Sequence, residues 1–370
     1  MTLNIVQPEI KRSHRVQRAV ADCDIHPVPR TIRELYPYLE KRWQEHYELF
    51  GVSRRQAPFA GPVYPKGQPD AARVDAWPTD GSRAGSSLPL MQQQHLDPNN
   101  VQLGILNVIS PHPGNYQNPD MASAFCRAVN GWQVEHWTAK DHRLKASVMV
   151  AYEEASAAVA EIDRLSGDPS FAQILLLSRT AKPLGHRDYW PMYEAAVRAN
   201  LPIGIHAFGN SGYPITPSGW PSYYIEEMAG HAQSCQSQVI SLALSGVFER
   251  FPTLRIAFIE SGFGWLPSLC WRLDSHWKTL KAETPHLKRL PSEYIREHIW
   301  FTTQPMEEAE NSAHIADIIE WIGWDRIMYS SDYPHWDFDD PAQTLMFDAS
   351  ESQQSRLFLQ NALDLYGASR

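Results

Sequence analysis

Short apolar runs alternate along the chain with longer segments in which apolar residues recur at helical spacing. Aliphatic and β-branched runs bounded by Gly, Pro or Asn are typical of buried strands, and the longer amphipathic segments are typical of helices. Strands are predicted at eight places: residues 16–26, 101–110, 144–152, 171–179, 201–209, 255–260, 298–304 and 326–332. Helices are predicted at residues 119–140, 153–165, 189–199, 232–250 and 309–322.

The repeated order of strand and helix predicts an α/β fold with parallel strands. Pro202 and Pro252 mark the ends of two predicted helices, because a residue that precedes proline is pushed out of the helical region. Eight strands are the number that closes a (β/α)8 barrel of the TIM type. We therefore expect residues 1–370 to form a single barrel domain.

Residues 51–96 break this rhythm with a long insertion after the first predicted strand. The segment is rich in Pro, Gly, Ser and Gln, and it is too long and too polar for an ordinary connection. Its position predicts a place at the rim of the barrel, where long loops often form lids. The alternative is a solvated insertion without a role.

Composition and charge narrow the classes of partner. The 370 residues are 43 % hydrophobic with a net charge of −9 and a pI near 5.9, which indicates a globular protein. Without a long Lys/Arg block, neither nucleic acid nor an anionic membrane is an expected partner. The N-terminus lacks the apolar core of a secretory signal, and no run is long enough to span a membrane, so a cytoplasmic protein is expected.

The four cysteines are far apart in the sequence and form no C-x-x-C motif. We expect Cys23, Cys126, Cys235 and Cys270 to be reduced thiols packed as small apolar groups. Neither a disulfide framework nor a cysteine metal site is therefore predicted.

Polar side chains follow the first predicted strand at alternate positions. Asp22, Asp24 and His26 would share one face of that strand, because residues two apart in a strand point the same way. The alternative is a surface strand that ends in a proline turn, where these side chains meet water. A D-x-H pattern is too short to decide between them, so the rest of a site must lie elsewhere in the chain.

Three later strands also end in groups that can bind a metal or move a proton. His206 ends the fifth strand, Glu260 ends the sixth and Asp332 ends the eighth. In a barrel the carboxyl ends of all strands open onto one face, which is where barrel enzymes hold their sites. Two histidines and carboxylates at that face are ordinary ligands of a divalent metal. His206 alone would more often be a histidine of the core, so the argument depends on the joint placement.

These segments resemble the amidohydrolase superfamily, in the branch of aminocarboxymuconate-semialdehyde decarboxylase and the resorcylate decarboxylases. The resemblance rests on Asp24-x-His26, on the run that ends at His206, and on SSDYPH at 330–335. It implies one metal ion held by Asp24, His26, His206 and Asp332, with Asp332 also touching the metal-bound water. Zinc is the first choice and manganese the second, because carboxylates make the ligand set harder.

The sequence departs from that family at the sixth strand, where the family commonly has a histidine and this chain has Glu260. Glu260 could take a proton from a metal-bound water, or it could only orient a ligand or cap a helix. Strand four ends in Arg179, so no carbamylated lysine is indicated and a one-metal site is expected.

Several other side chains are candidates for contact with the substrate. Arg179 could bind a substrate carboxylate or form a surface ion pair. Phe208, Trp265 and Trp336 could form walls of the pocket. Weaker candidates at its rim are His112, Asn115 and His231, and His335 could support Asp332 or merely end the strand. Core packing is the expected role of Trp190, Trp271, Trp300 and Trp321.

The favoured function is hydrolysis of a small organic substrate by a metal-activated water, with Asp332 or Glu260 as the base. Glu260 favours this reading, because a carboxylate is an ionised base near neutral pH. The alternative is a metal-dependent decarboxylase of the aminocarboxymuconate-semialdehyde decarboxylase type. A metal-free binding barrel is a rival from another class, and no nucleotide-binding motif is present. The resemblance also allows a homodimer.

Overall fold

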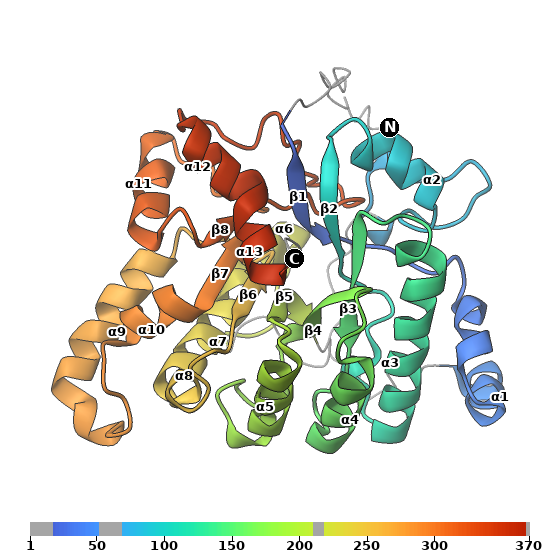
Figure 1. Cartoon of the computed structure of the whole chain (residues 1–370), viewed down its shortest axis with the longest axis horizontal. Coiled ribbons are helices and arrows are strands. Elements are labelled where there is room, and N and C mark those ends of the chain that lie inside the picture. The colour runs from blue at the N-terminus through green and yellow to red at the C-terminus, as the bar shows by residue number, and fades with distance from the viewer. Residues whose placement is uncertain (1–17, 52–68, 210–217, 368–370) are drawn as a thin grey trace.

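The computed structural model describes residues 18–51, 69–209 and 218–367, except for the side chain of Asn115. Eight parallel strands form one sheet in chain order, with helices around it (Figure 1). The strands are β1 (Val20–Ile25), β2 (Val101–Leu106), β3 (Leu144–Met149), β4 (Phe171–Arg179), β5 (Ile203–Gly209), β6 (Ile256–Ile259), β7 (Ile299–Thr302) and β8 (Ile327–Met328). Each lies within its predicted run.

The sheet curls until its first strand meets the segment that follows its last. The Cys23 amide donates to the Tyr329 carbonyl at 3.0 Å, and Ile25 pairs in parallel with Tyr333. The predicted (β/α)8 barrel is therefore confirmed. Strand residues are buried on both faces, as in all six residues of β1, because the barrel interior covers one face and the helices cover the other.

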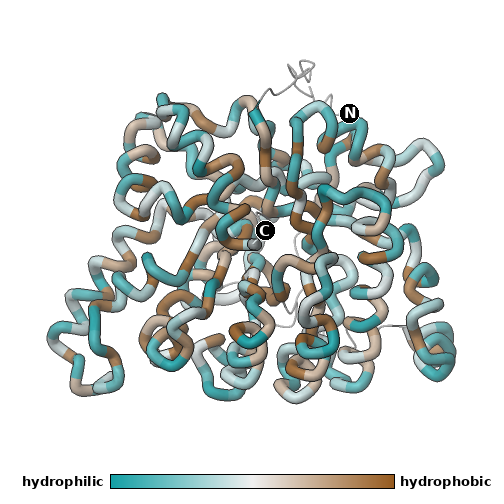
Figure 2. The backbone as a smooth tube through the Cα atoms, viewed as in Figure 1, coloured by the Kyte–Doolittle hydropathy of each residue, from teal (hydrophilic) through white to brown (hydrophobic). Residues whose placement is uncertain are grey.

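The helices cover the outside of the barrel. They are α1 (Lys41–Phe50), α2 (Leu88–Met91), α3 (Pro119–Gln133), α4 (Ala155–Leu165), α5 (Trp190–Ala199), α6 (Tyr224–Gly230), α7 (Ala232–Leu244), α8 (Val247–Arg250), α9 (Leu266–Leu280), α10 (Pro291–His298), α11 (Ala313–Ile322), α12 (Glu351–Ser355) and α13 (Asn361–Tyr366). The predicted helix 232–250 is divided into α7 and α8 at Gly246, which has a φ of 80°. Figure 2 shows hydrophobic positions along the central strands and hydrophilic ones on the outer turns.

The predicted eighth strand is shorter than expected. Only Ile327 and Met328 pair with β7, and the polar residues after them leave the ladder. Asp332 has a φ of 61°, which turns the chain inward at this point. The apolar pattern alone could not show where the ladder ends, because Tyr329 and Tyr333 are also buried.

The insertion differs from its prediction at its C-terminal end. Residues 52–68 lie outside the described residues, and 69–87 form two short 3-10 turns and loops. Residues 88–96, however, are helical, and Met91, His95 and Leu96 are fully buried. Their apolar side chains recur at helical spacing, so this stretch belongs to the core and not to a polar rim.

The insertion is also tied to the barrel mouth. Ala72 pairs with His335 in an antiparallel bridge, and the Arg73 amide donates to the Pro334 carbonyl at 2.9 Å. Gly85 packs so closely that a Cβ there would lie 2.5 Å from the His26 carbonyl oxygen. The described part of the insertion therefore touches the segments that carry the candidate site.

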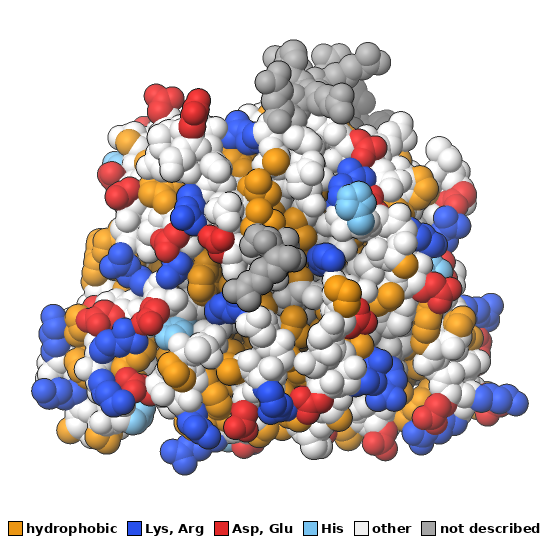
Figure 3. Space-filling view, viewed as in Figure 1, with side chains coloured by type: hydrophobic (Ala, Val, Ile, Leu, Met, Phe, Trp, Pro, Cys, Tyr) orange, Lys and Arg blue, Asp and Glu red, His pale blue; other side chains and the backbone are white. Residues whose placement is uncertain are grey.

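The surface agrees with the composition. Positive and negative side chains are interspersed over the face shown in Figure 3, and no described helix is long and apolar enough to cross a membrane. All four cysteines are buried free thiols, as predicted.

Trp271 is 59 % exposed, so its predicted place in the core is wrong.

Candidate metal centre and active site

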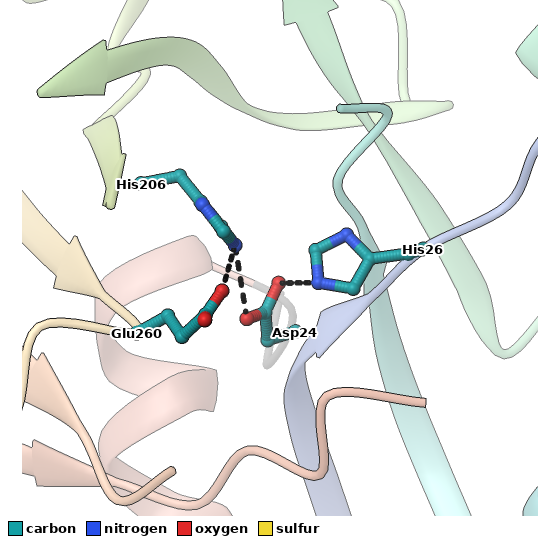
Figure 4. Close-up of side chains that lie close together, drawn as sticks. All are labelled: Asp24, His26, His206 and Glu260. Carbon is teal, nitrogen blue, oxygen red and sulfur yellow. Dashed lines mark ion pairs between the residues drawn. The ribbon is translucent and has the colours of Figure 1, made fainter. Parts of the chain in front are cut away.

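Four of the predicted chemical groups meet at the carboxyl ends of the strands. Asp24 lies on β1 and His26 directly after it, His206 lies on β5, and Glu260 follows β6. His206 Nε2 is 3.3 Å from Asp24 Oδ2 and 3.1 Å from Glu260 Oε2, and His26 Nε2 is 3.2 Å from Asp24 Oδ1 (Figure 4). Each of these residues is at most 2 % exposed.

Asp332 joins this group from the segment after β8. Its Oδ1 lies 2.8 Å from His26 Nε2 and 2.6 Å from His335 Nδ1, and the His335 ring stacks on that of His26 at 4.5 Å. Gln304 Nε2 approaches its other oxygen at 3.4 Å. His335 therefore lies where the sequence predicts it, beside Asp332.

Both histidines present the same ring nitrogen to the centre. His26 Nδ1 lies 2.7 Å from the Asn107 carbonyl oxygen, and His206 Nδ1 lies 2.7 Å from that of Ala207. A carbonyl oxygen can only accept, so each Nδ1 carries the proton. The two Nε2 atoms are then free to act as ligands, which is the usual arrangement of metal-binding histidines.

The chemistry of these atoms fits a divalent cation. Asp24 Oδ2, His26 Nε2, His206 Nε2 and Glu260 Oε2 are buried without a protein hydrogen bond of good geometry. One ligand atom from each residue can be chosen such that all lie within 4.8 Å of one another. Burying several carboxylates is costly unless a cation balances their charge. A metal ion would satisfy all four atoms together.

Burial alone would lower the pKa of the His206 imidazole, but Asp24 and Glu260 outweigh it and raise this pKa to about 10. Burial would also lower the pKa of the His26 imidazole, but Asp24 and Asp332 outweigh it and raise this pKa well above its usual value. Burial raises the pKa of the Asp24 carboxyl, but the two histidines hold it well below its usual range. Without a metal, protons therefore take the place of the cation at neutral pH.

Metal uptake is expected to release protons near pH 7, because a metal ligand must be a neutral imidazole and both histidines have raised pKa values. The apparent metal affinity should rise with pH until it passes the His206 pKa of about 10. Titration calorimetry at one pH, in buffers of different ionisation enthalpy, measures the number of protons released. A binding enthalpy independent of the buffer would contradict this expectation.

A ring of uncharged partners orients the ligands. Asn107 Nδ2 donates to Asp24 Oδ1 at 2.8 Å and to the Cys23 carbonyl, while Asn107 Oδ1 accepts from Ser147 and Gln173. Sequence reasoning missed Asn107, which lies inside the predicted strand 101–110 and directly follows β2 in the structure. Its partners on other strands became visible only in the folded barrel.

Asp22 is not part of the metal group. Its carboxylate accepts from the Ser331 amide at 2.9 Å and hydroxyl at 2.5 Å, and it lies 2.6 Å from His95 Nε2. His95 in turn contacts Asn99 at 3.0 Å and stacks on Tyr333 at 5.3 Å. This buried network joins the insertion, β1 and the SSDYPH segment, so it holds Asp332 in place.

Replacing His95 with alanine is expected to destabilise the fold by about 3–5 kcal/mol, because it removes a fully buried ring and leaves Asp22 without its partner. Gln93→Ala, at an exposed position of the same turn, should stay within about 0.5 kcal/mol of the parent protein. Urea unfolding measures both. Equal stabilities of the two variants would show that the network is dispensable.

Strained backbone gathers at this site. Phe208, Glu260 and Asp332 have φ values of 82°, 54° and 61°, in the left-handed region that residues other than glycine rarely adopt. Such conformations cost about 1–3 kcal/mol each and persist where the surrounding structure imposes them, often at active sites. Phe208 lies near the end of β5, Glu260 directly follows β6 and Asp332 follows β8. The side chain of each residue must turn toward the barrel mouth.

A cavity of about 880 Å³ opens above the metal group. His26, Phe208, Glu260 and Asp332 are among the residues that line it. His112 and Trp336 also line it, together with Val28, Arg83, Leu177, Tyr224, Glu227, Met228 and Asp337. Its size and its aromatic and apolar walls suit a small planar molecule.

Three predicted contact residues are not among the described residues that line this cavity. Arg179 Nη2 lies 3.9 Å from Glu227, the His231 ring packs edge-on against Phe208 at 5.3 Å, and Trp265 Nε1 donates to the Ser261 carbonyl. Arg179 and His231 contact Glu227 and Phe208, which line the cavity, but do not line it themselves. The predicted contact of the three residues with a substrate does not follow from these positions. A position at the end of a strand does not show whether a side chain lines the cavity or packs against the residues that line it.

A (β/α)8 barrel with divalent-metal ligands at the carboxyl ends of its strands defines a metal-dependent barrel enzyme. A sequence model of the amidohydrolase family matches residues 21–368, so the chain belongs to this family. The resemblance found in the sequence is therefore confirmed.

Curated and solved proteins agree with this placement. The chain is 22 % identical over 284 residues to a gamma-resorcylate decarboxylase of Polaromonas sp., covering 74 % of this chain and 86 % of that one. A dihydroxybenzoic acid decarboxylase of Polaromonas sp., solved with manganese and 2-nitroresorcinol, has a TM-score of 0.63 at 19 % identity over 95 % and 98 % of the chains. A manganese-bound 5-carboxyvanillate decarboxylase of Novosphingobium aromaticivorans has a TM-score of 0.67 at 18 % identity over 94 % and 96 %.

These comparisons change two expectations. The two solved proteins named above hold manganese, so they give no support to the choice of zinc. In this chain, the cluster of possible ligand atoms supports a single divalent metal. The named relatives are decarboxylases, so the alternative reaction is better supported than the favoured hydrolysis.

Proposed function

We propose that this enzyme is a manganese-dependent, non-oxidative decarboxylase of a small hydroxylated aromatic acid. The observation that carries the proposal is the set of four unsatisfied buried ligand atoms of Asp24, His26, His206 and Glu260. Two of these residues, His26 and Glu260, line an aromatic-walled cavity. The decarboxylases among its relatives supply the reaction class. A carboxylate and an adjacent hydroxyl of the substrate suit a site that prefers oxygen ligands.

Asp24, His26, His206 and Asp332 are the residues that would hold the metal. When bound, the divalent ion supplies Lewis-acid polarisation of the substrate's carboxylate and neighbouring oxygen. Phe208 and Trp336 flank the cavity, where they would orient a flat ring and exclude water. The expected binding partner is therefore a small-molecule substrate.

Asp332 and His335 are proposed to move the proton that the reaction needs. Decarboxylation breaks the bond between the ring carbon and the carboxylate carbon, and that ring carbon then takes a proton as CO2 leaves. Asp332 Oδ1 accepts from His335 Nδ1 at 2.6 Å, and both residues line the cavity. A carboxylate and imidazole in hydrogen-bond contact can pass a proton to a carbon above them.

The reaction is tested by turnover of hydroxybenzoate-type acids in ¹⁸O-labelled water, with CO2 trapped from the headspace. Stoichiometric CO2 with no oxygen label in the aromatic product is expected from the manganese-loaded enzyme. A labelled product without CO2 would restore the hydrolase interpretation. No CO2 from any acid of this class would reject the proposed substrate class.

We also propose that the insertion covers part of the cavity within a single barrel domain. Asp70, Ala71, Arg83 and Ala84 line the cavity, and Arg83 donates to Asp70 and to Ser110 across the mouth. These contacts support a role at the rim for the described part of the insertion.

A further inference from the structure

We propose that Glu260 is itself a ligand of the metal, and not the base that takes a proton from a bound water. The Glu260 carboxylate occupies the position where the family commonly has a histidine that serves as acid or base. Its surroundings in this chain are those of a ligand. The inference concerns metal binding and holds for either reaction of this centre.

The first support is distance. Glu260 Oε2 lies 3.1 Å from His206 Nε2, which is as close as Asp24 Oδ2 at 3.3 Å from the same atom. Figure 4 shows both carboxylates directed at that nitrogen, Asp24 from β1 and Glu260 from the residue after β6. Two carboxylates that meet at one imidazole nitrogen share a position that a cation can occupy.

The second support is what Glu260 lacks. Its Oε2 is buried and has no hydrogen-bond partner among the described residues, and the whole residue is 2 % exposed. A buried carboxylate oxygen whose only contact in the described part of the chain is the ion pair with His206 still lacks a hydrogen bond, so a cation is the expected partner. The oxygens of Asp332, in contrast, already contact His335 and Gln304. Asp332 is thus better equipped to handle a proton than Glu260 is.

The third support is the backbone. Glu260 has a φ of 54° directly after β6, and its amide donates to Thr302 Oγ1 at 3.2 Å on the neighbouring strand. This hydrogen bond anchors a strained conformation that aims the side chain inward. A rigidly held side chain suits a ligand, whose atoms must keep a defined geometry.

The added carboxylate changes the preference of the centre. With Glu260 as a ligand, the set contains two imidazoles and the carboxylates of Asp24 and Glu260, with Asp332 beside them. A histidine at position 260 would give three imidazoles, a set that is typical of zinc. Oxygen-rich sets suit harder ions such as manganese. Glu260 is therefore expected to shift selectivity toward manganese.

Glu260→Gln keeps the shape of the side chain and removes its charge. Manganese affinity, measured by the EPR signal of free Mn²⁺, should fall by at least about 100-fold in this variant, beyond the range of about 10- to 100-fold seen for residues that only support ligands. Glu227→Gln is the matched control for affinity, because Glu227 is a buried carboxylate that lines the same cavity but lies outside the ligand group. An unchanged affinity in Glu260→Gln, or an equal loss in Glu227→Gln, would overturn the inference.

Glu260→His tests the same point in the metal-loaded protein. Pulsed EPR of bound Mn²⁺ counts coordinated imidazole nitrogens, and we expect two in the parent protein and three in this variant. The ratio of zinc to manganese affinity should also increase. Two imidazoles in both proteins would place residue 260 outside the coordination sphere and reject the inference.

These measurements need no substrate, so they separate the ligand assignment from the proposed reaction. A parent protein that binds manganese but releases no CO2 would reject the decarboxylase and leave the role of Glu260 supported. A parent protein that binds no divalent metal would reject the ligand role as well.

Discussion

Replacing His206 with alanine should remove most of the metal from the protein while leaving the barrel folded. His206 Nε2 lies within 3.3 Å of both Asp24 and Glu260, so it is the shared contact of the two carboxylates. Its loss removes a ligand atom directly, and we expect at least about a 100-fold loss of affinity, beyond the range seen for residues that only support ligands. Elemental analysis after gel filtration measures the metal content.

The fold of this variant is checked separately. His206 lies at the mouth end of β5, where its side chain faces the ligand group, and apolar residues such as Ile203 and Ile205 hold the strand. Near-native circular dichroism is therefore expected. His142→Ala, at an exposed histidine, should keep its full metal content. Full metal retention in His206→Ala would remove His206 from the ligand set.

Replacing Asp332 with asparagine should reduce kcat by about 100- to 10,000-fold at saturating manganese, which is the usual effect of losing a proton-transferring group. Burial would raise the pKa of the Asp332 carboxyl, but His335 and His26 outweigh it and hold this pKa at about 2. The group is therefore ionised at neutral pH and accepts a charge-assisted hydrogen bond from His335. An amide in its place cannot carry a proton between His335 and the substrate.

Saturating manganese separates the loss of proton transfer from the loss of metal. Because His26, His206, Asp24 and Glu260 remain, the variant should still bind manganese, with weaker affinity. Asp348→Asn, at an exposed position, is the control for the loss of one negative charge. Turnover close to that of the parent protein in metal-replete Asp332→Asn would contradict the proton-transfer role.

The sequence alone determined the fold and most of the candidate ligands. Buried aliphatic runs such as Phe171–Arg179 specify strands that are covered on both faces, and their alternation with helices leads to a parallel barrel. In such a barrel every strand ends at the same mouth. Polar residues after the runs, such as His26 and His206, could therefore be brought together without coordinates.

Only the tertiary structure decided what each of those residues does. Asp22 and Asp24 are two residues apart in β1, so the pattern predicts that they point the same way. Asp22 nevertheless pairs with His95 from the insertion, while Asp24 contacts His206 in the metal group. The sequence allowed Glu260 to be a base, or a residue that orients a ligand or caps a helix. Its distance of 3.1 Å to His206 supports the ligand role that we propose instead. Arg179 reached a strand end as expected, but it does not line the cavity and lies 3.9 Å from Glu227, which does.

The physical reason is the range of the interactions. Side-chain alternation and burial are encoded within a few neighbouring residues, so a pattern reveals them. Partners such as His95, Asn107 and Gln304 come from elements that are far away in the chain, and they meet the ligands only when the barrel closes. The pattern of the sequence thus specifies which groups reach the mouth, and the closed barrel decides which of them face one another.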